Sequence, residues 1–495
     1  MLSTIRAVYR NGSIMRPLAP IALTAGALLA LGPFIAGGAG ASGATGGFGP
    51  LAPPNPAMGP QGTSTMHADS GSSDSTPFAG PGTGGVTVSS TSLRAACPSI
   101  LMGTDGMPVA VCTAISDKTP YVHLLDPQTG KSLAQMRLVK STTSDLAGGI
   151  YSYIDNLNRL VLVNAAGELM WITHQQGATG KWQLTESQSV QIGFDAVVGL
   201  VPDYQGRIWF ATAQGVAKKR GAVVGYYDPA DGSIRHRALR TGEQIANSIS
   251  SSPRGVAVAS TYALYLFGAA KNGRPVVRWR RAYDRGPARK PGQLSWGTGA
   301  TPVFFGPRTG YEYVTITDNA VPQENVLVHR TATGRQVCTV PMLGTNNSGT
   351  ENAPIGSGRS VFVASTYGYK YPASATTGPS SPASAPFVGG MQRIVVGARG
   401  TGCAVAWTNA VRSTAVPRLS LADGLLYTVQ VSRTGRYLYT TIDAATGAPV
   451  STSQIGSKRS NTLQMVGTIA PNGTLYQGTI TGFARVMAGS YAASR

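Results

Sequence analysis

The sequence predicts an all-β fold, a single β-propeller with eight four-stranded blades. The first observation is composition: 495 residues include 63 glycines and 32 prolines but only 13% charged residues, which is typical of a large, turn-rich β protein. The second is a series of short apolar runs rich in Val, Ile, Tyr and Thr. The third is self-similarity over a long period, which a β-sandwich lacks and a propeller shows.

The self-similarity is clearest in two sixteen-residue segments. NSISSSPRGVAVASTY at 247–262 and NAPIGSGRSVFVASTY at 352–367 lie 105 positions apart and share nine residues without a gap. Their apolar centres have the alternation of a buried strand. Related strands follow Gly-containing turns at QGRIWFATA (205), EYVTITDN (312), DGLLYTVQV (423) and NGTLYQGTI (472).

A second turn of the form D-x-x-[TD]-G completes the repeating unit. It occurs as DPQTG (126), DPADG (228) and DAATG (443), with RTATG (330) as a degraded copy. Each unit is therefore strand, turn, strand, loop, strand, turn, strand, and eight such units fit between residues 95 and 490. The last unit is short, so we expect the strand GVTVSST at 85 to complete it and close the ring; seven blades is the alternative.

The N-terminus is predicted to be a secretory signal over residues 1–41. Three arginines precede an apolar run at 21–31, and Ala39-Gly40-Ala41 suits a signal peptidase. No later stretch approaches the roughly twenty apolar residues of a membrane-spanning helix. We therefore expect a secreted monomer without a transmembrane anchor.

Residues 42–84 are rich in Gly, Ser, Thr and Pro, which predicts a disordered linker before a propeller domain at 85–495. Residues 371–390 have the same character inside the domain and are predicted to form a long loop between two strands.

The four cysteines fit an oxidising compartment. Cys97 and Cys112 are symmetric about the turn GTDG at 103–106, which predicts a disulfide across a hairpin. Cys338 and Cys403 each follow a Thr-Gly turn at similar positions in neighbouring repeats, so we expect the second disulfide there.

The formal net charge of +20 favours anionic envelope polymers or anionic ligands as partners. Solvated arginine-rich loops are the simpler interpretation. Nucleic acid is excluded as a partner, because aromatic residues do not alternate with the basic runs in a known reader motif.

The ends of the duplicated segment predict the position of a site. In a propeller the innermost strand starts, and the second strand ends, on the same face of the ring. This places Asn247 and Asn352 at one central mouth together with two Thr-Tyr pairs. The pairs predicted to bind a small ligand are Thr261, Tyr262, Thr366 and Tyr367.

Oxygen-bearing side chains at the same mouth suggest a Ca²⁺ site, because this ion takes six to eight oxygen ligands. The predicted metal ligands are Asp195, Asn247, Asp318, Asn319, Glu351 and Asn352. The alternative is structural, since Asn and Asp often cap turns by accepting backbone N–H groups.

The D-x-x-T-G turns, with Trp171 and Trp407 shortly after Gly167 and Gly402, resemble the outer turns of quinoprotein (PQQ-like repeat) propellers. The resemblance covers most of residues 95–490 and implies eight blades. Quinone dehydrogenases of that fold use adjacent cysteines and a stacking tryptophan. This chain has no adjacent cysteines, so we expect that PQQ is not its cofactor.

The Asp318-Asn319 doublet is similar in ligand type to the calcium centre of the paraoxonase and gluconolactonase propellers, where the metal assists lactone or ester hydrolysis. Three hypotheses follow: a secreted propeller binding a small ligand at its mouth, in one form as a Ca²⁺-dependent hydrolase; a non-catalytic envelope interaction protein with a basic surface; and a quinoprotein-like redox enzyme.

Overall fold

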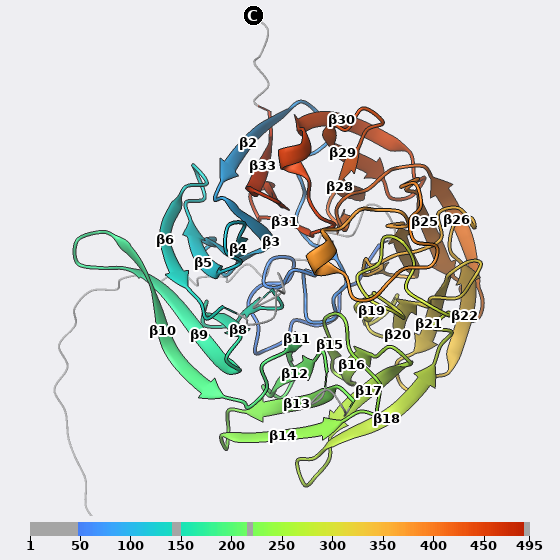
Figure 1. The fold of residues 1–495 in the computed structure, drawn as a ribbon, viewed down its shortest axis with the longest axis horizontal. Helices are drawn as coiled ribbons and strands as arrows, with labels where there is room; N and C mark the ends of the chain where they lie inside the picture. Colours follow the sequence, from blue (N-terminus) through green and yellow to red (C-terminus); the bar gives the residue numbers. More distant parts are fainter. Residues whose placement is uncertain (1–47, 141–149, 215–220, 490–495) are drawn as a thin grey trace, which may run out of the picture. The chain divides into compact units, whose positions relative to one another are not determined.

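In a computed structural model the chain forms an eight-bladed β-propeller (Figure 1). The structure describes residues 48–140, 150–214 and 221–489, and the predicted signal peptide lies outside them. Each blade has four antiparallel strands, which in seven of the eight blades run in chain order from the centre of the ring to its rim (Figure 1). Eight blades are confirmed, and the alternative of seven is wrong.

Each of the first four blades is built from four strands that are consecutive in the chain. Blade 1 contains β3 (Ala95–Met102), β4 (Pro108–Ala114), β5 (Pro120–Leu125) and β6 (Ser132–Arg137). Blade 2 contains β7 (Tyr153–Ile154), β8 (Leu160–Val163), β9 (Glu168–Gln176) and β10 (Trp182–Gln191). Blade 3 contains β11 (Val197–Pro202), β12 (Ile208–Thr212), β13 (Val223–Asp228) and β14 (Ser233–Ala238). Blade 4 contains β15 (Ser250–Ser252), β16 (Gly255–Ala259), β17 (Ala263–Ala269) and β18 (Pro275–Ala282).

The remaining blades include the one that closes the ring. Blade 5 contains β19 (Val303–Phe305), β20 (Tyr313–Thr317), β21 (Asn325–Arg330) and β22 (Gln336–Pro341). Blade 6 contains β23 (Ile355–Ser357), β24 (Ser360–Ala364), β25 (Met391–Val396) and β26 (Cys403–Asn409). Blade 7 contains β27 (Arg418–Ser420), β28 (Leu425–Val431), β29 (Tyr437–Asp443) and β30 (Pro449–Gly456). Blade 8 contains β31 (Gly467–Ile469), β32 (Leu475–Thr479), β33 (Gly482–Ala488) and, as its outermost strand, β2 (Val86–Ser92).

The strand β2 closes the ring as predicted, because it pairs antiparallel with β33 from Val86 opposite Ala488 to Ser92 opposite Gly482. Two 3₁₀ turns, η1 (Ala373–Ala375) and η2 (Lys458–Ser460), lie in loops. Among the described residues no helix is long and apolar enough to cross a bilayer.

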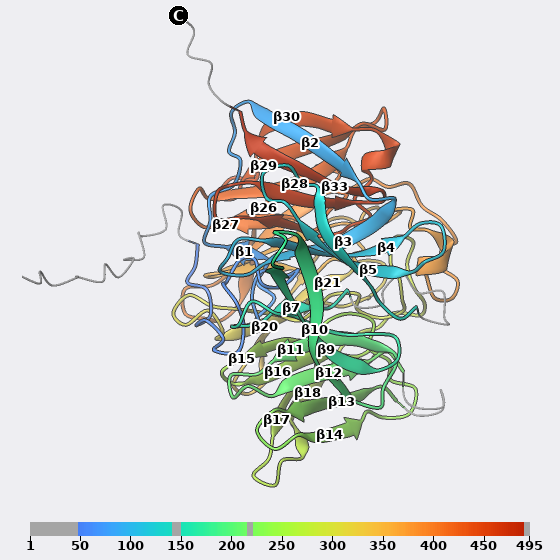
Figure 2. The ribbon, with the colours of Figure 1, turned by 90° about the vertical axis from the view of Figure 1, so that its left-hand side faces the viewer.

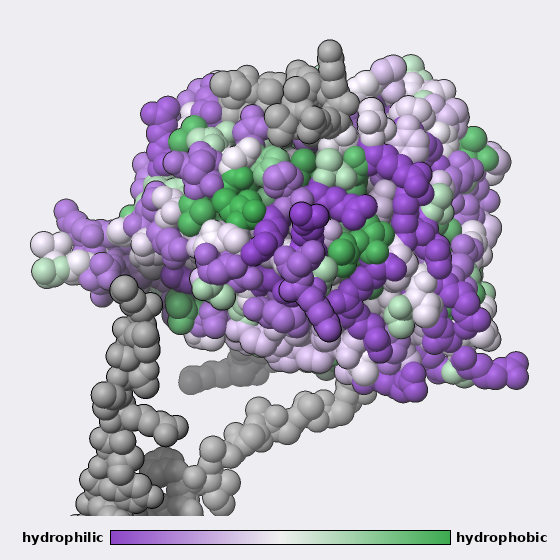
Figure 3. All heavy atoms as spheres, turned by 90° about the horizontal axis from the view of Figure 1, so that it is seen from below, coloured by the Kyte–Doolittle hydropathy of each residue, from purple (hydrophilic) through white to green (hydrophobic). Residues whose placement is uncertain are grey.

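Blades pack face to face through buried residues of their inner three strands, whereas the outermost strands are partly exposed. The rim beside β14 and β18 is accordingly mostly hydrophilic, with separate hydrophobic patches (Figure 3). The D-x-x-T-G turns contribute to this packing. The indole of Trp407 on β26 donates to the Ala444 carbonyl at 3.1 Å, and Trp279 on β18 makes the same bond to Thr331 at 2.8 Å. Trp171 instead lies on the third strand of its blade, and its ring contacts the edge of Tyr227 in the next blade, with the ring centres 6.0 Å apart.

The antiparallel strands define two faces of the ring. The mouth face carries the loops that enter each innermost strand and the turns that follow each second strand. The opposite face carries the turns between first and second strands and between third and fourth strands.

Residues 48–84, which we call the central segment, are not the disordered linker that composition predicted. The segment lies at the centre of the ring (blue in Figure 1) and toward one face, whereas the orange loop before β25 lies toward the other (Figure 2). It includes β1 (Ser75–Thr76), which pairs with β27. The propeller unit therefore begins before residue 85.

The central segment is held by backbone and side-chain groups of the innermost strands. It hydrogen-bonds in turn to β3, β7, β11, β15, β19, β23 and β27. Those strands present unpaired N–H and C=O groups to the channel, and buried backbone groups need partners. Small Ser, Thr and Gly residues fit this narrow space.

Buried charges fix the segment inside the ring. The carboxylate of Asp74 forms ion pairs with the guanidinium of Arg418 at 3.2 Å and with Nδ1 of His67 at 2.9 Å. Arg418, which is fully buried, also donates to the carbonyls of Met66 at 2.6 Å and Gly467 at 3.0 Å. Segment and ring therefore form one body.

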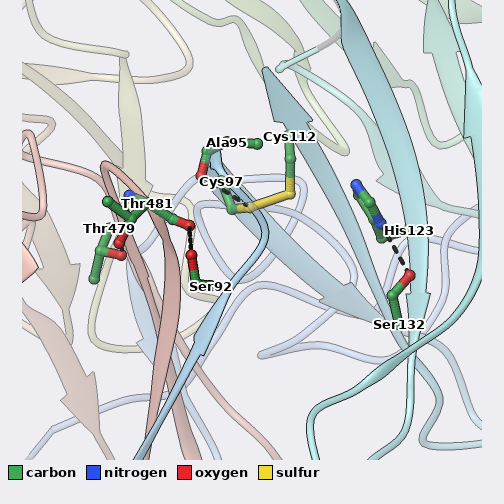
Figure 4. Close-up of a disulfide and its surroundings, with 8 residues drawn as sticks. All are labelled: Ser92, Ala95, Cys97, Cys112, His123, Ser132, Thr479 and Thr481. Atoms are coloured by element: carbon green, nitrogen blue, oxygen red, sulfur yellow. Dashed lines mark hydrogen bonds between the residues drawn. A yellow bond between two sulfur atoms is a disulfide. The ribbon is translucent and has the colours of Figure 1, made fainter. Parts of the chain in front are cut away.

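Both predicted disulfides are present. Cys97–Cys112 joins β3 and β4 within blade 1 (Figure 4), and Cys338–Cys403 joins the outermost strands of blades 5 and 6. Disulfides persist in oxidising compartments, which agrees with a location outside the cytoplasm.

Candidate site at the mouth face

The duplicated segment occupies equivalent positions in blades 4 and 6. Ser260 and Ser365 follow the second strand of each blade, and each hydroxyl accepts the N–H of the tyrosine two residues on, at 3.2 Å and 3.1 Å. Thr261 and Thr366 are buried and bond the neighbouring entry loop, since their hydroxyls accept N–H groups of Gln244 and Glu351. The repeated Ser-Thr-Tyr is therefore explained by turn structure.

Asp318 and Asn319 stand at the same place in blade 5, as the sequence predicted. One oxygen of Asp318 accepts the Ala320 N–H at 3.2 Å, the same bond that Ser260 makes, and the other accepts the Asn325 side chain at 2.8 Å. Burial raises the pKa of Asp318. Asn319 donates to the carbonyls of Arg285 and Ala288.

Asn247 and Glu351 meet across two blades. The Asn247 amide donates to the Glu351 carboxylate at 2.9 Å, and its oxygen accepts the Tyr151 hydroxyl at 2.7 Å. The second Glu351 oxygen accepts the Leu294 N–H at 2.8 Å. Burial raises the pKa of Glu351 to about 7.

Among the six predicted metal ligands, Asn247 and Glu351 contact each other, and the others have separate hydrogen-bond partners or are exposed. Asn352 instead donates to Gln464 at 3.0 Å, and Asp195 is exposed at the start of blade 3. Within 48–140, 150–214 and 221–489, no group of three His, Cys, Asp or Glu residues is arranged to hold a metal ion. The predicted oxygens are mostly satisfied by neighbouring amides and N–H groups.

The mouth is covered by the loop between β24 and β25, which includes the loop predicted at 371–390. Thr377 N–H bonds the Leu294 carbonyl at 2.8 Å, and the guanidinium of Arg289 bonds the Gly378 carbonyl at 2.9 Å. Tyr369 reaches blade 8, where its hydroxyl donates to Asn461 at 2.6 Å. The loop thus spans from blade 5 to blade 8 over the channel, and the central segment fills the channel from the other side.

A buried cation supports the entry loop of blade 5 beneath this cover. Lys290 Nζ donates to the Ala320 carbonyl at 2.6 Å and lies 3.5 Å from the Glu324 carboxylate. Burial raises the pKa of Glu324 to about 8, and Lys290 opposes that effect. Lys290 and Glu324 therefore interact with each other and stabilise the entry loop of blade 5.

The exposed chemistry of this face is an aromatic–arginine stack, formed by Tyr262, Arg285 and Trp296. The guanidinium carbon of Arg285 lies 3.8 Å from the centre of the Tyr262 ring and 3.5 Å from that of Trp296. Each aromatic residue is 39% exposed. Of the three, the sequence analysis predicted only Tyr262 as a ligand-binding residue. Arg285 lies in the basic stretch RWRRAYDRGPARK at 278–290, and that charge was the available signal.

Hydrogen bonds to the backbone carbonyl of Arg285 hold the stack in place. Trp296 Nε1 donates to the Arg285 carbonyl at 3.0 Å, and the Asn319 amide donates to the same carbonyl at 2.7 Å. No carboxylate of the described residues forms an ion pair with Arg285, and its Nε is buried without a hydrogen-bond partner. Asn319, predicted as a metal ligand, thus anchors the stack.

No protein-family model and no curated protein sequence matches the chain. Solved structures do resemble it. A europium-containing methanol dehydrogenase superposes with a TM-score of 0.50 at 10% identity, over 86% of this chain and 98% of that one. The quinohemoprotein alcohol dehydrogenase from Comamonas testosteroni gives 0.51 at 10% identity, over 89% and 82%.

The fold is that of the quinoprotein propellers. The alcohol dehydrogenase ADHIIG from Pseudomonas putida HK5, also a quinohemoprotein, gives a TM-score of 0.51 at 11% identity, over 86% of this chain and 80% of that one. The resemblance expected from the D-x-x-T-G turns is confirmed at the level of fold, and identities this low show the fold alone.

These neighbours give no support to the expectation that PQQ is absent, which stays a prediction. Within the part of the chain that the structure describes, the residues do not form a site that fits such a cofactor with its metal. All four cysteines are in the two disulfides, and the carboxylates under the mouth are engaged with amides and with Lys290. The central segment fills the channel. We therefore derive no redox step.

Proposed function

We propose that this protein is a secreted, monomeric binding protein, and that the stack of Tyr262, Arg285 and Trp296 takes a small anionic ligand that carries a sugar or aromatic ring. The observation that carries the proposal is a half-buried arginine that pairs with no carboxylate of the described residues and is held between two aromatic rings, each 39% exposed.

The geometry prepares Arg285 to read an anion. Both faces of its guanidinium are covered by rings and its Nε is buried, whereas its two Nη groups make no hydrogen bond to any described residue and remain available at the edge. Arginine binds a carboxylate or phosphate through two parallel hydrogen bonds, which are stronger than bonds between neutral groups. Because the rings restrict the side chain beforehand, less conformational entropy is lost on binding.

The rings define the rest of the ligand. Tyr262 and Trp296 offer apolar surface beside the anion site, and aromatic side chains stack on sugar or aromatic rings. A ligand that joins a carboxylate to such a ring would engage both kinds of group. Acidic sugars of envelope polymers have this chemistry.

The structure favours binding over the Ca²⁺-dependent hydrolysis that the sequence suggested. Hydrolysis by this route requires several oxygens around one ion, whereas Asp318, Asn319 and Glu351 are each bonded to separate partners. The calcium hypothesis stays a prediction without further support.

Binding is tested with pairs of charged and neutral probes: glucuronate against glucose, and benzoate against benzyl alcohol. We expect calorimetry to show tighter binding of the anion in each pair. Arg285→Ala should weaken anion binding about tenfold or more, and Arg285→Lys should restore only part of it. Trp296→Ala should weaken both members of a pair.

Arg278→Ala is the matched control, because it removes one charge from the same basic run at an exposed position of β18. Equal loss in Arg278→Ala and Arg285→Ala, or equal binding of charged and neutral probes, contradicts the proposal. Secretion is tested separately by the mass of the mature protein in the medium, which we expect to begin at Ser42.

A further inference from the structure

A groove on the opposite face, between blades 5 and 6, concentrates positive charge. Its volume is about 520 Å³, and it lies among the turns that join first to second and third to fourth strands. Five arginines line it, with one carboxylate, Glu312. The arginines are Arg308, Arg330, Arg359, Arg393 and Arg399.

Two of these arginines are fixed in place. Arg330 donates to the Gly400 carbonyl of the next blade at 2.8 Å and lies over the Tyr313 ring. Arg393 donates to the Ser360 hydroxyl at 3.0 Å and lies over the ring of Phe48 from the central segment, 4.9 Å from its centre. Arg393 Nη1 also donates to the Ala445 carbonyl at 3.0 Å, and the nearby Asp443 carboxylate opposes the lowering of the Arg393 pKa by burial. Neither Arg330 nor Arg393 forms an ion pair with a carboxylate of the described residues.

The other three are exposed. Arg308 forms the groove's ion pair with Glu312, at 3.4 Å. Arg359 and Arg399 make no hydrogen bond, ion pair or ring contact through their side chains with any residue that the structure describes. Four of the five guanidinium groups therefore line one concave surface without an ion pair to any carboxylate that the structure describes.

In a second groove on the same face, the arginines are paired with carboxylates. Between blades 2 and 3, a hollow of about 460 Å³ contains Arg159, whose guanidinium lies 2.7 Å from the Asp155 carboxylate. Arg207 beside it is paired with Asp203 in the same way, at 2.7 Å. The turn between the first and second strands thus pairs its arginine with a carboxylate in blades 2, 3 and 5, whereas Arg359 in the same turn of blade 6 has no such partner among the described residues.

We propose that the groove between blades 5 and 6 binds a soluble oligoanion carrying at least two phosphate or carboxylate groups. The spread of four unpaired guanidinium groups exceeds what one anion satisfies. A concave surface admits a chain of anionic groups more readily than a flat bilayer. Because this face lies across the filled channel from the aromatic–arginine stack, the site is independent of the proposed function.

The test uses tripolyphosphate, with inorganic phosphate as the single-anion probe. We expect calorimetry at low salt to show tripolyphosphate binding that is at least tenfold tighter than phosphate and weakens as salt rises. Arg359→Ala/Arg399→Ala should weaken tripolyphosphate binding about tenfold or more without changing the melting temperature, since neither side chain has a structural contact.

The chain offers a matched control. Arg254 is the counterpart of Arg359 in the duplicated segment, and Arg274 lies in the later turn of blade 4 as Arg399 does in blade 6; both are exposed. Arg254→Ala/Arg274→Ala removes the same charge from the same turns, and we expect binding to be retained. Equal loss in the two double variants, or phosphate binding as tight as tripolyphosphate, overturns the proposal.

Vesicles of anionic phospholipid provide the remaining arm. We expect them to bind both double variants alike, through the general charge of the molecule. Tighter binding to vesicles than to tripolyphosphate, lost only in Arg359→Ala/Arg399→Ala, overturns the assignment to a soluble ligand.

Discussion

Single residues at the mouth show where reading the sequence succeeded and where it could not. Asn247, Asp318 and Glu351 were correctly placed on one face, because repeat alignment reports position. Their roles depend on partners far along the chain: Glu351 meets Asn247 and Leu294, and Asn352 meets Gln464. No periodicity encodes such pairs, so the sequence alone does not show which of these oxygens accept hydrogen bonds from amides.

Glu351 makes stability depend on pH. Its pKa is raised by burial from 4.5 to about 7, so between these values the folded state holds a proton that the unfolded state has lost. The contribution of Glu351 to the free energy of unfolding is therefore fully present below pH 4.5 and is lost as the pH rises through 7. A tenfold difference in proton affinity corresponds to about 1.4 kcal/mol, so the loss is on the order of 3 kcal/mol.

We expect the free energy of unfolding of Glu351→Gln, measured with urea at pH 5 and pH 8, to change less between the two than that of the wild type. Glu186→Gln, at an exposed position of β10, is the control and should follow the wild type. A slope unchanged by Glu351→Gln would show that this carboxyl is not the responsible group.

Among elements, the D-x-x-T-G turns have a role that their spacing alone does not reveal. The sequence predicted the turns, but not that Gly447 lies against the Trp407 indole of the preceding blade. The glycine has φ of +77°, and a Cβ there would overlap the indole. Glycine is therefore required at this position for two reasons: the backbone has a positive φ, and there is no space for a Cβ beside the indole.

Gly447→Ala should therefore lower the free energy of unfolding by about 2 kcal/mol or more, through backbone strain and overlap together. Gly232→Ala tests the strain alone, because Gly232 has φ of +70° in the corresponding turn of blade 3 with no atom within 4 Å of an added Cβ. We expect a loss of about 1 kcal/mol there. Equal losses would exclude the contact with Trp407 as a cause.

Strand positions were the most predictable elements, since buried strands need apolar residues and turns need glycine. The closing strand β2 was also predictable, because an incomplete last blade leaves an unpaired edge. The central segment was not, because its composition matches that of a disordered chain. Low apolar content does not prevent order when seven inner strands supply hydrogen-bond partners, as they do here.

At the scale of the whole molecule, the central segment joins blades that are otherwise only neighbours. Removing residues 1–84 while retaining β2 would leave the ring closed but expose unpaired groups of the inner strands and the buried Arg418. Breaking a buried ion pair alone costs about 3 to 5 kcal/mol. We expect the melting temperature of this truncation to fall by about 10 °C or more, or folding to fail.

Removal of residues 1–47 is the control, and we expect it to leave the melting temperature unchanged. Calorimetry of the two truncations gives the comparison. If removal of 1–84 has no greater effect than removal of 1–47, the segment does not contribute to the stability of the ring.

The position of the central segment also has a consequence for biosynthesis. These residues leave the ribosome early, yet their hydrogen-bond partners extend from Met102 to Tyr439. The strand β2 likewise pairs with β33, near the end of the chain. Their native contacts cannot form until nearly all of the polypeptide has been made. Contacts so distant in sequence make folding slow, so the newly made chain passes through a long interval in which its inner strands are open to other proteins.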